Sequence, residues 1–514
     1  MSADGTRAEL GRERLVVVGF GMATVRLIED LTGTGGLGPD GRFDVTVIGE
    51  EEHLAYNRVL LSAVLEGTSQ PEATVMRSRA WYELLGVRLV TGRRAVAIDR
   101  DSATVELSDG ELIGYDRLVL ALGGSPVLPP VRGAITRAGI LHPKVVAFRT
   151  LDDCNRLLEA IEPGQTAVVI GGGLLGLEAA RGLINRGLTV DVVEVAEYLL
   201  NTQLEPEPAK VLRRAVSLLG IGVHCGVRAV ALAGDDENLR GVHLNDRFVL
   251  SADVVVLACG VRPRVSIARE AGLEIGRGIV VDDQLRSVTD PRIHAIGDCA
   301  EHAGVVPGLV GPAWEQAAVL ARHLGGDASA AYTGARLVTR LRASDLDVAV
   351  LGSVASVPGD DVVEYANPLR GIYRRMVIRE GRLSGAVLVG QLDGIGLLVQ
   401  YFDRQDLLPA DPTWYLLGEE ETTGEPLRLP DDAAVCQCNN VRAGTVREAV
   451  AAGAVTVSEV AARTRATTGC GGCAGAVALL LREPAEKEAA EKEAADKELA
   501  EKDAGEAHSE GVPV

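Results

Sequence analysis

A glycine-rich turn at residues 171–176 has the spacing of a dinucleotide-binding loop. An apolar run that predicts a buried strand precedes it, and a stretch that predicts a helix follows it. Gly171 permits the tight turn, Gly173 lets the backbone approach a pyrophosphate at the helix N-terminus, and Gly176 lets helix and strand pack closely. Glu194 closes the next predicted strand, where a carboxylate accepts hydrogen bonds from an adenosine ribose. A glycine-rich turn alone can be only a turn, but this combination predicts a dinucleotide site.

The carboxylate of Glu194 also bears on the choice of cofactor. A negative charge at this point repels the 2′-phosphate of NADPH and suits the free 2′-hydroxyl of NADH, so the sequence predicts NADH in preference to NADPH. Glu178, just inside the predicted helix, is a candidate for the nicotinamide pocket, and a structural helix position is the alternative. No residue is assigned as a general acid or base, because the cofactors supply the chemistry.

A second nucleotide site is predicted near the start of the chain. Gly19 and Gly21 form a Gly-x-Gly turn after the strand-like run 15–18, and Glu50 ends a second strand-like run, where it would bind a ribose. Thr24 stands where the third glycine is expected. This departure loosens helix packing in principle but leaves both phosphate-facing glycines.

Two later strand-like runs support this first site. One ends in the small residues Ala121 and Gly123, which let the backbone approach a ligand. The other ends in Gly297 and Asp298, where an aspartate can accept hydrogen bonds from a ribityl hydroxyl. Each run is by itself a strand followed by a turn. Their order along the chain indicates that the central dinucleotide unit is an insertion within another domain.

The composition excludes several classes of protein. A chain of 514 residues is long enough for about three or four domains. Its net charge of −20 argues against nucleic acid or an anionic membrane surface as a partner. No apolar run reaches the length of a membrane span, and the first run, 15–18, is far too short for a secretory signal. A cytoplasmic protein is predicted.

The eight cysteines fall into two groups. Four are scattered: Cys154, Cys225, Cys259 and Cys299. The other four form two close pairs near the C-terminus: Cys436 with Cys438, and Cys470 with Cys473. In a cytosolic chain such pairs suggest a metal or cluster before they suggest disulfides. Glycines around the second pair free backbone amides to face sulfur, and zinc and an iron–sulfur cluster both stay open.

The glycine loops and later strands resemble the flavoprotein reductases with two dinucleotide-binding domains, over about residues 14–410. Residues 55–62 and 171–180 look most like the N-terminal half of the assimilatory nitrite reductase large subunit and its nitrate reductase electron-transfer relatives. The Cys-x-Cys-Asn and Thr-Gly-Cys-Gly-Gly-Cys motifs resemble the BFD-like [2Fe-2S] module, over about residues 435–481. An upstream flavin supplies electrons that zinc could not accept, which favours [2Fe-2S].

The resemblance implies an α/β fold with an FAD domain split around an inserted NAD(P)H domain. An α+β interface domain, which covers the flavin edge or packs subunits into a homo-oligomer, and a small helical cluster domain follow. The expected boundaries are 14–150 and 255–330 for the FAD domain, 151–254 for the NAD(P)H domain, 331–417 for the interface domain, 418–432 for a linker, 433–483 for the [2Fe-2S] domain and 484–514 for an acidic tail.

The resemblance also implies the site residues. FAD is expected at Gly19, Gly21, Met22, Glu50, Arg58, Ala121, Gly123, Gly297 and Asp298. NADH is expected at Gly171, Gly173, Leu175, Gly176, Glu194 and Gly260. The expected cluster ligands are Cys436, Cys438, Cys470 and Cys473.

Two absences narrow the class. Related disulfide reductases carry Cys-x4-Cys near the flavin, and peroxide or coenzyme A disulfide reductases carry one cysteine there, but none stands between Glu50 and Ser62. Thiol chemistry at the flavin is therefore not expected, and Cys299 reads as a small buried thiol. The cysteines of a sirohaem and [4Fe-4S] region are also missing from the sequence, so the chain is not expected to reduce nitrite alone.

The predicted function is electron transfer from NADH through FAD and a [2Fe-2S] cluster to a separate protein, expected to be the catalytic subunit of a nitrate or nitrite reductase. One alternative is a general ferredoxin or rubredoxin reductase with a fused ferredoxin-like module. Another is a redox-sensing or cluster-carrying regulatory flavoprotein with little turnover. The tail from Pro484 reads as a spacer, and an acidic docking segment is the alternative.

Overall fold

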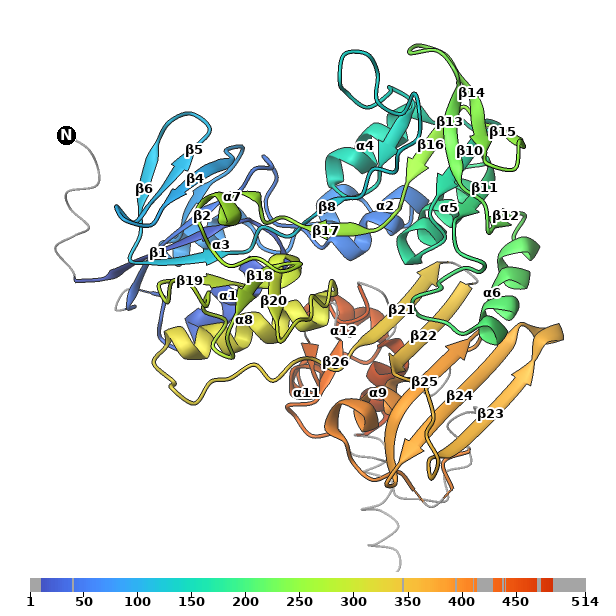
Figure 1. The fold of residues 1–514 in the computed structure, drawn as a ribbon. Coiled ribbons are helices and arrows are strands. Elements are labelled where there is room, and N and C mark those ends of the chain that lie inside the picture. Colours follow the sequence, from blue (N-terminus) through green and yellow to red (C-terminus); the bar gives the residue numbers. More distant parts are fainter. Residues whose placement is uncertain are drawn as a thin grey trace, which may run out of the picture. The chain divides into compact units, whose positions relative to one another are not determined.

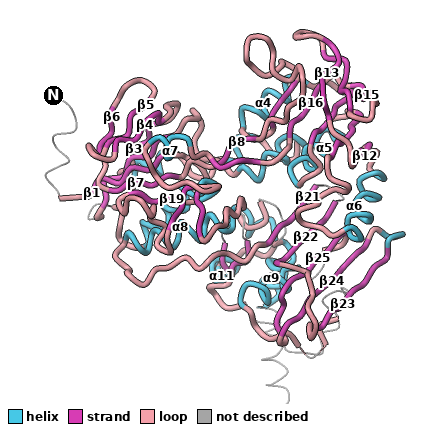
Figure 2. The backbone as a smooth tube through the Cα atoms, viewed as in Figure 1, coloured by secondary structure: helices cyan, strands magenta, loops and turns pink. Residues whose placement is uncertain are grey.

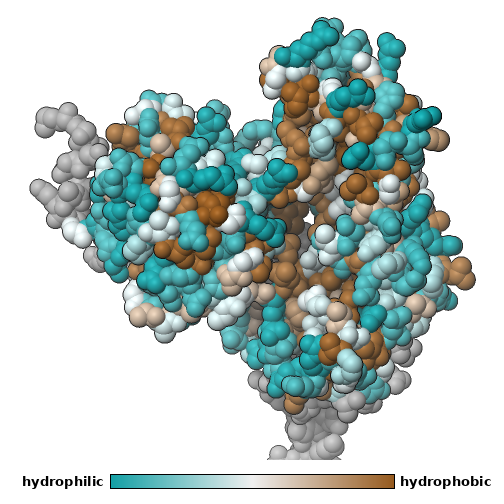
Figure 3. Space-filling model, in the orientation of Figure 1, coloured by the Kyte–Doolittle hydropathy of each residue, from teal (hydrophilic) through white to brown (hydrophobic). Residues whose placement is uncertain are grey.

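The computed structural model describes residues 11–38, 41–343, 346–392, 395–409, 411–413, 429–436, 439, 441–468 and 473–483. The chain divides into a larger unit, residues 1–392 with 401–416, and a smaller unit, residues 393–400 with 417–514. No helix among the described residues is long and apolar enough to cross a membrane. Figure 3 shows hydrophobic side chains in separate patches among hydrophilic ones on the face drawn.

The first domain of the larger unit is built on a parallel sheet of five strands (Figure 1). Its order is β19–β7–β1–β2–β3, with β1 at Glu13–Val18, β2 at Phe43–Ile48, β3 at Arg88–Val90, β7 at Arg117–Leu120 and β19 at Ile293–Ala295. The apolar runs of β1, β2 and β7 are buried, as expected for inner strands of a parallel sheet. Helices α1 (Met22–Gly33) and α8 (Val310–Leu324) pack together, so the two ends of this sequence region share one core.

Smaller elements complete this domain. An antiparallel meander is formed by β4 (Ala95–Asp99), β5 (Thr104–Leu107) and β6 (Leu112–Gly114). The domain also contains the short helices α3 (Arg79–Leu84) and α7 (Ser266–Glu270) and the parallel strand pair β18 (Ile279–Val281) and β20 (Ala300–His302).

The second domain has its own five-stranded parallel sheet, in the order β12–β11–β10–β16–β9. The strands are β9 (Val145–Ala147), β10 (Thr166–Ile170), β11 (Thr189–Glu194), β12 (Gly222–Cys225) and β16 (Val254–Leu257). The helices are α4 (Leu151–Ala160), α5 (Leu174–Asn185) and α6 (Pro206–Leu218), and β13 (Ala229–Gly234), β14 (Leu239–Leu244) and β15 (Val249–Ser251) form an antiparallel sheet.

The second sheet extends beyond the residues predicted for this insertion, 151–254. Strand β9 pairs with β16, with Val145 opposite Val255, so both strands belong to the second sheet rather than to the flanking domain. The strands of this sheet lie between residues 145 and 257, whereas the predicted domain spans residues 151–254. An antiparallel ribbon of β8 (Gly124–Pro126) and β17 (Val261–Pro263) carries the chain between the two domains.

Helix α2 (Leu61–Glu66) lies between β2 and β3 in sequence but packs against the second domain. Its residues Leu61, Val64 and Leu65 belong to the core that contains α5. Arg186 donates from Nε to the carbonyl of Leu65 at 2.8 Å and from Nη2 to that of Val64 at 3.2 Å. These bonds reach carbonyls in the last turn of α2 and attach a segment of the first domain to the second.

The third domain is an antiparallel sheet in the order β21–β22–β25–β24–β23 (Figure 2). The strands are β21 (Val338–Ala343), β22 (Leu346–Gly352), β23 (Asp361–Asn367), β24 (Ile372–Arg379) and β25 (Arg382–Val389). Helix α9 (Ile395–Arg404) follows in sequence, with residues 395–400 in the smaller unit and 401–404 in the larger one. Apolar side chains of this sheet, including Val348 and Val387, share the core of the second domain.

The smaller unit is a compact helical domain with its own core. Its elements are the short antiparallel pair β26 (Ala434–Cys436) and β27 (Val441–Arg442), helices α11 (Ala443–Ala451) and α12 (Val457–Thr464), and a helical segment at residues 474–483. Helix α12 begins with a capping box, in which Thr456 and Glu459 each bond the other's backbone.

Candidate functional site

The first glycine loop joins β1 to α1, and at Gly19 it leaves no room for a side chain. Gly19 has a φ of +111°, and an added Cβ would lie 2.0 Å from the carbonyl oxygen of Ala121, at the end of the neighbouring strand β7. Gly21 is the N-cap of α1, where no described side chain caps the helix and no described atom lies within 4 Å of an added Cβ. The uncapped amides and open space at Gly21 fit a phosphate group.

Thr24 compensates for the missing third glycine of this loop. Its side chain is fully buried, and its hydroxyl donates to the carbonyl of Gly19 at 2.6 Å. A hydrogen bond therefore fastens the first turn of α1 to the loop. The sequence had suggested only looser packing at this position.

The second glycine loop joins β10 to α5 and repeats the geometry of the first. Gly171 has a φ of +117°, and an added Cβ would lie 2.3 Å from the carbonyl oxygen of Ala258, which follows β16. Gly173 is the N-cap of α5, with no described side-chain cap and open space around it. An added Cβ at Gly176 would lie 1.9 Å from the carbonyl oxygen of Gly171. Each glycine thus meets a different steric demand, and the loop fits a pyrophosphate at Gly173.

Glu194 lies at the end of β11, directly beneath the second loop. Its Oε2 accepts from the backbone amide of Gly172 at 2.6 Å, and its Oε1 accepts from that of Ala196 at 2.8 Å. The residue is only 9% exposed, whereas the next one, Val195, is 69% exposed. The carboxylate therefore shapes the loop, a role that the sequence did not indicate beside the predicted ribose contact.

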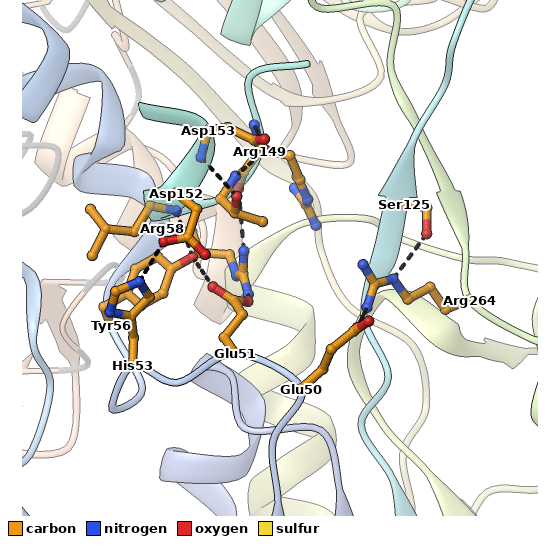
Figure 4. A network of polar contacts seen from close by, with 12 residues as sticks. Glu50, Glu51, His53, Tyr56, Arg58, Ser125, Arg149, Asp152, Asp153 and Arg264 are labelled. Carbon is orange, nitrogen blue, oxygen red and sulfur yellow. Dashed lines mark hydrogen bonds and ion pairs between the residues drawn. The ribbon is translucent and has the colours of Figure 1, made fainter. Parts of the chain in front are cut away.

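Glu50 ends the corresponding strand of the first domain but makes a different contact. Its Oε2 forms an ion pair with Nη1 of Arg264 at 2.7 Å, and Arg264 also donates from Nε to the hydroxyl of Ser125 at 2.9 Å (Figure 4). Glu50 is exposed and lies on the rim of the first loop. The partner Arg264 was not predicted, because it stands 214 residues away in the sequence.

A partly buried polar network lies between the first domain and the start of the second (Figure 4). Arg58 forms an ion pair with Glu51 and donates from Nη1 to the carbonyl of Arg149 at 3.2 Å. The hydroxyl of Tyr56 donates to Glu51 at 2.7 Å and accepts from the amide of Leu151 at 2.9 Å. Burial raises the pKa of Tyr56 well above its ordinary value, so the phenol keeps the proton that it donates.

Asp298 joins this network through Arg149. The Nη2 of Arg149 donates to Oδ2 of Asp298 at 2.7 Å. Gly297, with a φ of +77°, donates from its amide to the side-chain oxygen of Gln316 on α8 at 2.7 Å. The structure thus brings Arg58 and Asp298, both predicted for FAD, to the same network, and it adds Arg149, which the sequence reasoning missed.

Cys299, next to Asp298, has the surroundings expected of a structural thiol. It is fully buried, and its Sγ contacts the carbonyl oxygens of Leu120 at 3.3 Å and Ile296 at 3.4 Å. Burial raises its pKa to about 12, so the thiolate form is disfavoured.

The remaining predicted residues lie on the same two loops or at strand ends. Met22 is buried in the first turn of α1, and Leu175 and Glu178 are half-buried in α5. Gly123 and Gly260 have φ values of +67° and +91° and open space at the Cβ position. All of these residues follow the carboxyl ends of parallel strands, where ligands bind in such sheets.

The smaller unit buries two of the four paired cysteines. Cys436 ends β26 and is 1% exposed, and Cys473 precedes the helical segment 474–483 and is 5% exposed. The amide of Thr467 donates to Sγ of Cys473 at 3.1 Å, which suits a thiolate ligand. Cys438 and Cys470 lie outside the described residues, so no group of three possible metal ligands is found in the described part of the chain.

Residues 13–317 match the family described as pyridine nucleotide-disulphide oxidoreductase. The chain belongs to this family. Residues 338–400 of this oxidoreductase match the rubredoxin NAD+ reductase C-terminal domain, and residues 434–483 match the BFD-like [2Fe-2S] binding domain. It is therefore an FAD-dependent NAD(P)H oxidoreductase with a [2Fe-2S] domain, as the sequence predicted.

Similar proteins come from nitrogen metabolism and from electron transfer. The oxidoreductase is 34% identical to a nitrite reductase (NAD(P)H) of Bacillus subtilis over 468 residues, 90% of this chain and 57% of the relative. It is also 34% identical to the assimilatory nitrate reductase electron transfer subunit of the same species over 481 residues, 93% of this chain and 60% of the relative. The chain thus spans less than two-thirds of either relative.

Among solved structures, the oxidoreductase is similar to a ferredoxin reductase from Rhodopseudomonas palustris. The identity is 32% and the TM-score 0.65, with 74% of this chain and 91% of that chain covered. This likeness agrees with the two-sheet architecture described above.

Proposed function

We propose that this oxidoreductase takes electrons from NADH and delivers them one at a time to a separate protein, the catalytic component of an assimilatory nitrate or nitrite reductase. The observation that carries the proposal is the joining, in one chain, of two dinucleotide loops with open helix N-termini to a domain that buries Cys436 and Cys473, one cysteine from each predicted pair. FAD supplies the change from two-electron to one-electron transfer, and a [2Fe-2S] cluster accepts single electrons.

We assign the two loops to different cofactors. The loop at Gly19 and Gly21, with Met22, Glu50, Arg58, Ala121, Gly123, Gly297 and Asp298, would hold FAD. The loop at Gly171, Gly173 and Gly176, with Leu175, Glu194 and Gly260, would hold NADH, and Glu178 would line the nicotinamide pocket. The four cysteines Cys436, Cys438, Cys470 and Cys473 would hold the cluster.

The chain's own residues prepare these sites. The ion pair of Arg149 with Asp298 and that of Arg58 with Glu51 orient charged groups before any ligand binds. The contacts of Glu194 fix the loop that receives the pyrophosphate. Such preorganised polar groups lower the cost of positioning a cofactor.

An anaerobic titration with NADH tests the route. The cluster-loaded protein is titrated while visible absorption and low-temperature EPR spectra are recorded. Bleaching of the flavin together with a reduced [2Fe-2S] signal is the expected result. Bleaching without a cluster signal, in protein shown by iron and sulfide analysis to be loaded, would contradict the proposed route.

A second function is favoured by the likeness to a ferredoxin reductase and by the match to the rubredoxin reductase domain. In that case the acceptor would be a small ferredoxin or rubredoxin. Rates of electron delivery to a purified ferredoxin, a rubredoxin and a nitrite reductase component separate the two functions. Sustained turnover with any of these would exclude a purely regulatory flavoprotein.

The choice between NADH and NADPH should be shifted by Val195→Arg. An arginine at this exposed position can pair with the 2′-phosphate while Glu194 keeps its two backbone contacts. We expect the ratio of kcat/KM for NADPH to that for NADH to rise by about tenfold, which corresponds to a free-energy difference of about 1.4 kcal/mol. Steady-state kinetics with both cofactors measure it.

Val195→Gln is the matched control for this prediction, since it adds polarity and length without charge. Its cofactor ratio should stay close to that of the parent protein. Glu194→Arg is a poorer test, because it removes two hydrogen bonds from the loop and places a charge in a buried position. An unchanged ratio in a well-folded Val195→Arg protein would contradict the position assigned to the adenosine ribose.

A further inference from the structure

The turn that precedes the second cysteine pair has an unusual backbone. Arg465, the C-cap of α12, has a φ of +64°, and Thr467 has a φ of +66°. Left-handed conformations are costly for residues with a Cβ and persist where surrounding contacts hold them, often at functional sites. The contacts that hold residues 465–468, called here the cluster turn, therefore bear on the cysteines beside it.

Asn439 holds the cluster turn from the other cysteine pair. Its Nδ2 donates to the carbonyl of Arg465 at 2.7 Å and to Oγ1 of Thr468 at 3.0 Å. The hydroxyl of Thr468 in turn donates to the carbonyl of Arg465 at 2.8 Å. One amide group thus fixes both ends of the turn, and it comes from the residue that follows Cys438.

The held turn directs one backbone amide at a sulfur atom. Thr467 lies between the two points fixed by Asn439, and its N–H donates to Sγ of Cys473 at 3.1 Å. A hydrogen bond to a cluster sulfur stabilises the more negative, reduced state over the oxidised one and so raises the reduction potential. The strength of this effect depends on the position of the turn.

We propose that Asn439 is a positioning residue that sets the reduction potential of the [2Fe-2S] cluster, by holding the cluster turn so that the amide of Thr467 reaches the sulfur of Cys473. The inference rests on the ligand role proposed for Cys473. It assigns to the Asn of the Cys-x-Cys-Asn motif a task distinct from metal binding, namely to link the two cysteine pairs through the turn.

The midpoint potential of the cluster in the full-length protein tests this inference. In Asn439→Ala both side-chain donors are lost, and the potential should become more negative. At a fixed solution potential, the ratio of reduced to oxidised cluster should fall by about tenfold, which is about 59 mV for a one-electron couple. The titration uses dithionite and redox mediators with EPR detection, so its result does not depend on NADH oxidation or on any acceptor protein.

A matched pair of substitutions at Thr468 tests the same contact, and a third substitution, at Thr467, is a further control. Thr468→Val removes the hydroxyl that accepts from Asn439, whereas Thr468→Ser keeps it. The first should shift the potential in the same direction as Asn439→Ala, and the second should leave it unchanged. Thr467→Gly keeps the N–H and suits a positive φ, so the potential should also stay close to that of the parent protein.

The outcomes separate this inference from the proposed function. If Asn439→Ala does not retain iron, the pair Thr468→Val and Thr468→Ser decides the question in loaded protein. Equal potentials in the valine and serine variants would overturn the role of the turn. A shifted potential in a protein whose cluster NADH cannot reduce would support the turn and contradict the electron route.

Discussion

Replacing Cys473 by serine should give a protein that still binds FAD and oxidises NADH with ferricyanide but carries no [2Fe-2S] cluster. The thiol is buried and accepts from the amide of Thr467, so the site suits a sulfur ligand, and a serine oxygen is a poorer ligand than a thiolate for an iron–sulfur cluster. Electron delivery to a protein acceptor should fall by at least about 100-fold, because even residues outside the ligand set cost about 10- to 100-fold when removed.

The measurements are iron and sulfide content, the visible spectrum, and the rates with ferricyanide and with the acceptor protein. Cys154→Ser is the matched control. That thiol is also fully buried, but it lies in α4 of the larger unit, with its Sγ 3.8 Å from the carbonyl of Leu61. The control should keep iron, FAD and both activities. Full delivery to the acceptor by a cluster-free Cys473→Ser protein would show that the cluster is not on the electron path.

The local parts of the architecture could be predicted from sequence because each depends on a few adjacent residues. A buried apolar run, a glycine turn and a helix follow one another within about 20 residues, and the structure has β1 with α1 and β10 with α5 at those places. The discontinuous first domain was also predicted, because its last strand was recognised at residues 293–298.

The second sheet extends beyond the predicted boundaries for a physical reason. Strand β9 is three residues long and joins its sheet only by pairing with β16, more than 100 residues later. No local pattern distinguishes such a strand from one at the edge of the first sheet. Similarly, α2 carries an ordinary apolar face, and only the tertiary structure shows that this face packs on α5.

The contacts within the candidate site had little signal in the sequence. Arg149 and Asp298 stand 149 residues apart, so their ion pair has no sequence signal. One local signal was present near Arg149: Thr150 and Asp153 form a capping box at the start of α4, which the spacing of these two residues indicates. A similar limit applies to Asn439, because its motif was recognised but its contact with the cluster turn depends on the fold.

The two dinucleotide loops solve the same steric problem with different residues. In the first loop Thr24 bonds the carbonyl of Gly19, whereas in the second Gly176 allows the carbonyl of Gly171 to approach the helix. The first solution tolerates a side chain at the third position and the second does not. The second loop should therefore be the more sensitive of the two to a substitution at its third position.

Replacing Gly176 by alanine should destabilise the second domain and reduce NADH oxidation on the order of 100-fold. Alanine is the better helix former by about 1 kcal/mol. However, the added Cβ would lie 1.9 Å from the carbonyl oxygen of Gly171, and overpacking against backbone costs about 1–3 kcal/mol or more. The clash outweighs the gain in helix propensity, so the substitution should lower the stability of the domain. Helix α5 must move away from β10, and the amides at its N-terminus move with it.

Gly173→Ala separates the loss of binding from the loss of stability. Its backbone has a φ of −79°, which alanine adopts readily, and no described atom lies within 4 Å of the added Cβ. Thermal unfolding should therefore be unchanged. The methyl group occupies the space assigned to the pyrophosphate and should cost one charge-assisted hydrogen bond, worth about 1.5–3 kcal/mol. The Kd for NADH should therefore rise by about 10- to 100-fold. If Gly173→Ala binds NADH as tightly as the parent protein, the placement of the pyrophosphate is contradicted. If Gly176→Ala is as stable as the parent protein, the steric role of Gly176 is contradicted.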